Sequence, residues 1–198
     1  MENKILDGTG AGWGARVDNR FRLHTDSVTR TQSQQAILLG EGFNISTGSI
    51  TLTSANQSAV FYIENDSNTD LVIKEIGIAL GTSTGGAGIA TIALSAKATA
   101  GTIISNATAV TTNFNRNLGS TKAIDGNVFK GIEGATLTGG TSAGSTSRSS
   151  FVDPIIFDAD IFVLPKGMSI GVFVTPQSGN TSQSCVVFAT VFYETATQ

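Results

Sequence analysis

The sequence predicts an all-β protein built as a single antiparallel sandwich or barrel of eight or nine strands. Three observations favour this fold. From residue 42 onward, short runs alternate apolar with polar or small residues, which is the period of a strand. Turn residues (Gly, Pro, Asn and Asp) separate these runs at regular intervals. Only one short segment has a helical pattern, and strands without intervening helices are typical of antiparallel sheets.

The composition is that of a folded, weakly charged chain. Its 198 residues suffice for one sizeable core. Charged residues make up 14%, against about 25% in ordinary soluble domains. A net charge of -3 argues against a nucleic-acid partner. The apolar fraction of 40% is too high for a disordered chain.

Residues 1–30 predict a separate docking arm, and residues 31–198 predict the sandwich domain. Four of the six arginines, the single Trp and the single His lie in this arm. Residues 15–17 and 20–24 alternate strictly and predict two short strands with a turn at residues 18–19. So short a segment cannot bury its own apolar face, so we expect it to pack on the main domain or on a neighbouring chain.

The arm supplies the candidate partner-binding residues, because Arg and aromatic side chains are enriched at interface cores. Those residues are Trp13, Arg16, Arg20, Phe21, Arg22 and Leu23. The arm carries five basic and four acidic residues, for a net charge of +1, while the rest of the chain has a net charge of -4. Opposite signs favour a weak attraction between subunits, which salt would screen.

The elements of the domain follow in order. Residues 31–40 predict a short helix, with Thr31 or Ser33 as its N-cap and Gly40 at its end. The predicted strands cover residues 43–45 leading into 49–53, then 59–63, 71–80, 89–98, 102–112, 127–130, 155–164, 169–175 and 184–193. Residues 81–88 predict a loop. The last strand is apolar on both faces, so it is either a core strand or one that a second subunit covers.

Few residues could carry chemistry, and we expect no enzyme, no cofactor and no metal. The single Cys185 lies among apolar neighbours and predicts a buried, unreactive thiol. The single His24 leaves no two-histidine metal motif. Asp153, Asp158 and Asp160 form the one compact carboxylate set, and its simpler interpretation is an exposed strand end.

The chain start has no apolar stretch of signal-peptide length, and no run of 18 apolar residues occurs. We therefore expect synthesis in a cytoplasm, with no membrane partner. Residues 76–115 carry one formal charge, Lys97, and residues 134–147 carry none. Such neutral surfaces suit close contact between proteins, because few charges must be desolvated. The alternatives are an assembly subunit and a low-charge monomer.

Short motifs along nearly the whole chain resemble virion structural proteins of tailed bacteriophages. They lie at residues 7–10, 15–20, 23–25, 42–48, 61–65, 80–86, 115–120, 130–131, 133–134 and 164–167. The resemblance implies a jelly-roll-like β-sandwich in a virion. The role that fits it best is a cement or decoration subunit on the capsid exterior, as a trimer bound to the major capsid protein. The family brings no catalytic residues.

Two alternatives stay open. One is a tail, neck or fibre component, which would be present in far fewer copies than the shell protein. The other is a carbohydrate-binding sandwich, which needs aromatic side chains displayed on a face or in loops.

Overall fold

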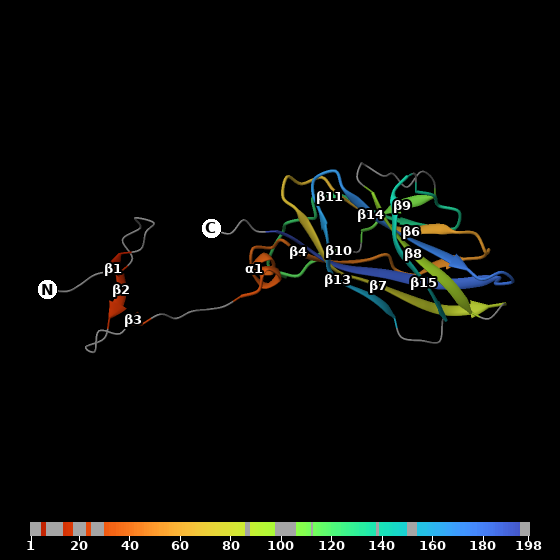
Figure 1. Cartoon of the computed structure of the whole chain (residues 1–198), viewed down its shortest axis with the longest axis horizontal. Coiled ribbons are helices and arrows are strands. Elements are labelled where there is room, and N and C mark those ends of the chain that lie inside the picture. Colours follow the sequence, from red (N-terminus) through yellow and green to blue (C-terminus); the bar gives the residue numbers. More distant parts are fainter. Residues whose placement is uncertain are drawn as a thin grey trace. The chain divides into compact units, whose positions relative to one another are not determined.

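The computed structural model describes residues 5–6, 14–17, 23–24, 30–85, 88–97, 106–111, 113–137, 139–149 and 154–194. The chain divides into two compact units, Met1–Thr31 and Gln32–Gln198. Figure 1 shows the sandwich of the second unit, with most of its strands labelled by their number in chain order. The two units are described separately.

The first unit contains a three-stranded antiparallel sheet in the order β1-β2-β3, formed by Ile5–Leu6, Gly14–Val17 and Leu23–His24. In the β2–β3 pair, Arg16 lies opposite His24 and Val17 lies opposite Leu23. The predicted pairing of two short strands is therefore present. The predicted turn at residues 18–19 and the predicted strand residues 20–22 lie outside the described residues.

The second unit is a sandwich of two antiparallel sheets, which confirms the all-β fold class. We call one sheet the β15 sheet: its order is β10-β4-β15-β7-β13, and β5 also pairs with β15. Its strands are β4 (Gly42–Ser46), β5 (Ile50–Leu52), β7 (Leu71–Thr84), β10 (Asn113–Asn115), β13 (Ile155–Leu164) and β15 (Ser182–Tyr193).

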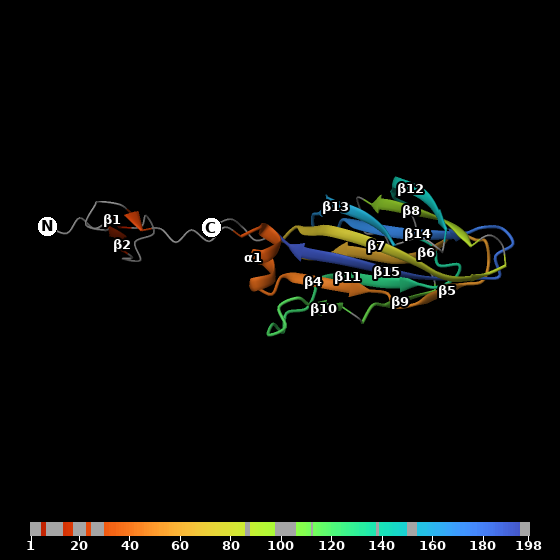
Figure 2. The ribbon, with the colours of Figure 1, turned by 90° about the horizontal axis from the view of Figure 1, so that it is seen from below.

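The other sheet, the β14 sheet, has the order β12-β8-β14-β6-β11-β9. Its strands are β6 (Ser58–Asn65), β8 (Ile89–Lys97), β9 (Ala107–Ala109), β11 (Gly126–Gly131), β12 (Thr141–Ser149) and β14 (Ser169–Pro176). Figure 2 shows the strands of both sheets running along the same axis, which is the aligned packing of a sandwich.

Alternation along the strands builds the core between the sheets. In β15, Cys185, Val187, Ala189 and Val191 are all buried in the main core cluster, while the residues between them are partly exposed. The facing strands of the β14 sheet contribute Ile92, Leu94, Ile170, Val172 and Val174. Because a strand turns successive side chains to opposite faces, one face of each sheet fills the core and the other faces outward.

The one described helix of this unit, α1, spans Gln32–Leu38, within the predicted range. Gly40 ends it at a φ of 74°. Its N–H donates to the Ile37 carbonyl, and the Glu41 N–H donates to the Ala36 carbonyl at 2.8 Å. These bonds form the glycine-ended cap that satisfies the last helical carbonyls.

The prediction of eight or nine strands is too low, because the described residues of the sandwich form twelve. The sequence missed β12, whose Ser, Thr and Gly residues give no apolar alternation. It also missed β10, a strand of three residues. The predicted loop at residues 81–88 begins too early: β7 continues to Thr84, since Ser182 and Gln183 of β15 pair with this extension.

Gly131 lies where β11 comes very close to the backbone of β6 and to Ala135. A Cβ at this position would lie 1.8 Å from the Ala59 carbonyl oxygen and 2.7 Å from the Ala135 Cβ. Backbone cannot yield as a side-chain tip can, so Gly131→Ala should lower the free energy of unfolding by about 2 to 3 kcal/mol. Urea unfolding measures the change.

The matched control is Gly119→Ala, where the nearest atom outside the chain neighbours is the Asn117 Oδ1, 3.6 Å away. This variant should stay within about 0.5 kcal/mol of the wild type. Equal stability of the two variants would contradict the close approach at Gly131.

Candidate interaction surface

Two of the three carboxylates that the sequence sets together, Asp158 and Asp160, lie on the edge strand β13. Among the described residues, no group of three or more His, Cys, Asp or Glu side chains could hold a metal ion. Asp158 lies on β13 opposite Glu75 of β7, and a register shift follows between Asp158 and Phe162. Asp160 lies inside the shifted stretch, and its sharing of one face with Asp158 stays a prediction. Asp153 lies outside the described residues.

Buried polar side chains make structural contacts instead. The Tyr62 hydroxyl donates to the Glu64 carboxylate at 3.0 Å, and the Asn127 amide donates to both Glu64 and Asp66. The Tyr193 hydroxyl donates to the Asp125 carbonyl at 2.6 Å and accepts from the Asp125 N–H. Burial holds the pKa of Tyr193 well above its usual value. These groups tie strands to loops.

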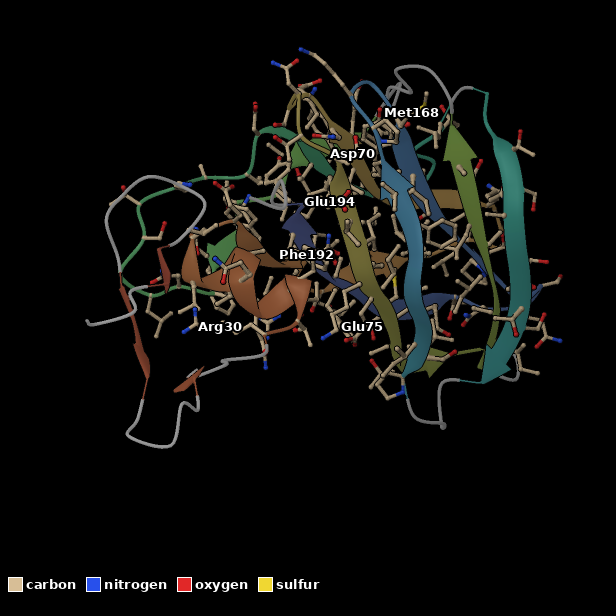
Figure 3. All side chains as sticks on the ribbon, turned by 60° about the vertical axis from the view of Figure 1, so that its left-hand side comes forward. Arg30, Asp70, Glu75, Met168, Phe192 and Glu194 are labelled. Carbon is tan, nitrogen blue, oxygen red and sulfur yellow. The ribbon has the colours of Figure 1, made fainter. Side chains whose placement is uncertain are left out.

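The candidate interaction surface is the outer face of the β15 sheet, turned away from the core. One row across it consists of Gly42, Phe192, Val72 and Val163 on β4, β15, β7 and β13. Helix α1 covers part of this row, since Ala36 packs with Val72 and Phe192. Figure 3 shows Phe192 close to α1 and Glu75 farther from it. Val163, at the end of the row, is 48% exposed.

A second apolar row lies farther along β15 and is open. Phe188 lies opposite Gly77 of β7, and Ile156 of β13 lies on the other side of that glycine. A Cβ on Gly77 would lie 2.0 Å from the Phe188 ring, so the ring rests over the glycine. Ile156 is 54% exposed. This row therefore presents an aromatic ring and an aliphatic side chain to the surroundings.

A shallow pocket of about 460 Å³ lies beside the open row. Phe188 lines one side of it, and Phe114, which is 53% exposed on the edge strand β10, lines another. Its polar residues include Asn44 and Thr190, and the Thr190 hydroxyl donates to the Asn44 Oδ1 at 3.2 Å. The pocket is thus mainly apolar, with two aromatic side chains and a few polar groups in its lining.

The outer face of the β14 sheet is different, because the chain covers it with its own residues 132–137. The Ala59 N–H donates to the Ala135 carbonyl at 2.8 Å, and Ala135 packs with Tyr62. The Leu137 side chain lies 2.6 Å from where a Cβ of Gly171 would be. The strap therefore covers the part of this outer face around Tyr62 and Gly171, as α1 covers part of the other.

The strap is anchored through Glu133, whose carboxylate accepts from the Thr53 N–H at 2.9 Å and from the Thr53 hydroxyl. Hydrogen bonds from Ser54 and Thr53 hold the pKa of Glu133 below its usual value. The negative charge is thus favoured where it joins the strap to the turn after β5.

Among the predicted partner-binding residues, Arg16 and Leu23 lie on β2 and β3. Trp13, Arg20, Phe21 and Arg22 lie outside the described residues. The doubly apolar pattern of the last strand indicated that Phe188 faces away from Val187, as it does. Phe114 and Ile156 were missed as surface residues, because their exposure depends on which strands stand at the sheet edges.

The Cys185 thiol is buried as predicted, with 1% of the residue exposed. Burial raises its pKa from the ordinary 9.0 to about 12, so the folded protein keeps the thiol protonated where the unfolded chain would ionise it. Its contribution to stability is present below pH 9.0 and is lost as the pH rises toward about 12.

Iodoacetamide at pH 8 should therefore label Cys185 only as fast as the protein unfolds, because the thiolate is the reactive form. Mass spectrometry follows the labelling with and without urea. Thr51→Cys is the control, since it places an additional cysteine at an exposed position on β5. Rapid double labelling of the folded Thr51→Cys variant would contradict the burial of Cys185.

No helix among the described residues is long and apolar enough to cross a membrane. Comparison with protein-family models, curated proteins and solved structures gave no match.

Proposed function

We propose that the protein is a non-enzymatic structural subunit of a bacteriophage virion, a cement or decoration protein bound to the outside of the capsid. The observation that carries this proposal is the open apolar outer face of the β15 sheet. It supports a role in which this face is covered by another protein for most of the molecule's life. The resemblance of the sequence motifs to phage virion proteins supports the virion as the place where this contact is made.

The chemistry of the face suits contact with the shell protein. Fully burying a side chain such as Phe114 or Ile156 would contribute about 1.5 to 3 kcal/mol. Glu75 and Asp158 occupy neighbouring positions on β7 and β13, which favours a partner that brings a basic group. A capsid displays the surface of its shell protein in many copies. In the proposed role, this surface is the binding partner.

In this proposal the arm makes the second contact. Trp13, Phe21 and Leu23 would be its apolar anchors. Arg16, Arg20 and Arg22 would meet carboxylates or backbone carbonyls of a neighbouring subunit or of the shell. The subunits act as a homo-oligomer, and the resemblance favours a trimer. No nucleic acid or membrane takes part.

A carbohydrate-binding module is the second candidate, and the pocket between Phe114 and Phe188 favours it. A sugar ring could stack its C–H face on an aromatic ring while its hydroxyls reach Asn44 and Thr190. The two tyrosines do not help, because Tyr62 and Tyr193 are buried. A screen of bacterial polysaccharides that gives no binding would exclude the carbohydrate-binding function. For a virion protein, a low copy number per particle would favour a tail or neck component over a cement protein.

The open face is tested by Phe114→Lys combined with Ile156→Lys. Two charges placed on the contact should weaken binding to capsids stripped of this protein by tenfold or more, because each lysine would have to be desolvated. Co-sedimentation measures occupancy. Leu118→Lys, at a residue 88% exposed in a turn, is the control and should bind normally. Unchanged capsid occupancy by the double variant would contradict the role of this face in binding.

The arm is tested by deleting residues 1–25. The sandwich has its own core, so its thermal unfolding should stay close to that of the full chain while capsid occupancy is lost. Circular dichroism and co-sedimentation provide the two readings. Normal occupancy after the deletion would refute the docking role of the arm.

A further inference from the structure

The orders of the two sheets end in four edge strands, and three of them are protected against pairing with another chain. A fifth strand, β5, pairs only with β15 among the described strands and has only three residues. Exposed edges offer unpaired backbone N–H and C=O groups, and proteins blunt them with short strands, charges, prolines and bulges. β9 and β10 have three residues each. β13 follows Pro154, carries Asp158 and Asp160, and has a register shift after Asp158. Each of these edges carries at least one protecting feature.

The fourth edge, β12, lacks most of these protections. It has nine residues, and in the part of the chain that the structure describes it pairs with β8 alone. In Figure 3 it is the outermost strand of its sheet. It contains no proline, and its single formal charge is Arg148 near one end. A register shift between Ser142 and Gly144 leaves the stretch from Gly144 to Ser149 regularly paired.

We propose that β12 pairs antiparallel with β12 of a second copy of this chain, which joins the two β14 sheets across a two-fold axis. The charge of β12 indicates which strand can pair with it. The strand is neutral from Thr141 to Ser147, so a charged partner strand would lose hydration with no opposite charge to meet. Among the described edge strands, β12 is the one that is both long and nearly uncharged. Its best match on this chain is therefore itself.

The geometry of an antiparallel pair fixes which faces of the two strands are shared. Ser145 and Ser147 lie opposite Ala93 and Thr91 of β8. The core residues Ile92 and Leu94 alternate with Ala93 and Thr91, so both serines face outward. A two-fold axis perpendicular to the sheet keeps outward residues opposite outward residues. Ser145 and Ser147 of one copy would thus lie on the same face as those of the other.

This inference does not depend on the capsid role, and it predicts a dimer where the resemblance implies a trimer. Light scattering on the full-length protein, over a wide range of concentration, should give twice the chain mass of 20.4 kDa. Ser145→Lys combined with Ser147→Lys should return the mass to one chain, because like charges directly opposite destabilise a strand pair. The double Asp variant at the same positions should also be monomeric.

Mixing the double Lys variant with the double Asp variant should restore the dimer, since lysines would then lie beside aspartates. This result would also show that both variants are folded. The matched control is Thr91→Lys combined with Ala93→Lys. It adds the same charges to the same rows, one strand inside the edge, and should remain dimeric.

A wild-type protein of one chain mass at every concentration would overturn the proposal, and so would one of three chain masses. A dimer that survives the Lys substitutions at Ser145 and Ser147 would place the contact elsewhere and would also overturn it. Capsid occupancy, measured in parallel, keeps this outcome separate from the proposed function, because a monomer that still coats capsids contradicts only the strand pairing.

Discussion

The sandwich depends on the burial of one face of each sheet against the other. The alternating residues of β15 and the matching residues of β14 and β8 fill this core, and burial of their apolar surface stabilises both sheets. Because side chains alternate along a strand, filling the inner faces leaves a second face on every sheet. The composition of those outer faces is not fixed by the core, so they can be adapted to contact other molecules.

The two outer faces are treated differently. On the β14 sheet, residues 132–137 pass over Tyr62 and Gly171 and cover the apolar surface there. On the β15 sheet, α1 covers only the row of Phe192 and Val72. The strap and the helix show that this chain can cover apolar sheet surface with its own segments. Phe114 and Ile156 lie on the two edge strands of this sheet, with Phe188 on β15 between them. Leaving these three side chains without a covering segment from the described part of the chain favours a contact surface over an incidental feature, since single scattered apolar residues are common but a band of them indicates binding.

Much of the fold could be predicted from the sequence, because the core strands alternate strongly and turn residues separate them. β12 could not, because its only structural requirement is to pair with β8 at an edge, which Ser, Thr and Gly satisfy without an apolar pattern. Only part of the open face of the β15 sheet could be predicted from the sequence. The doubly apolar pattern of β15 fits either a core strand or one that a second subunit covers. The exposure of Phe114 and Ile156 follows from strand order, a long-range property that local periodicity does not contain.

The few charged residues of the chain are distributed unevenly over the fold. Several of its charged side chains lie where they bind neighbours across loops and strand ends: Lys122 pairs with Glu41, and Lys166 donates to Asn68. The neutral residues 134–147 run from the strap into the edge strand β12. A monomer gains solubility from charges on exposed edges, whereas a subunit that buries an edge in a partner loses free energy for every charge it must desolvate. The distribution of charge therefore favours contact along this edge, which belongs to a different sheet from the open face.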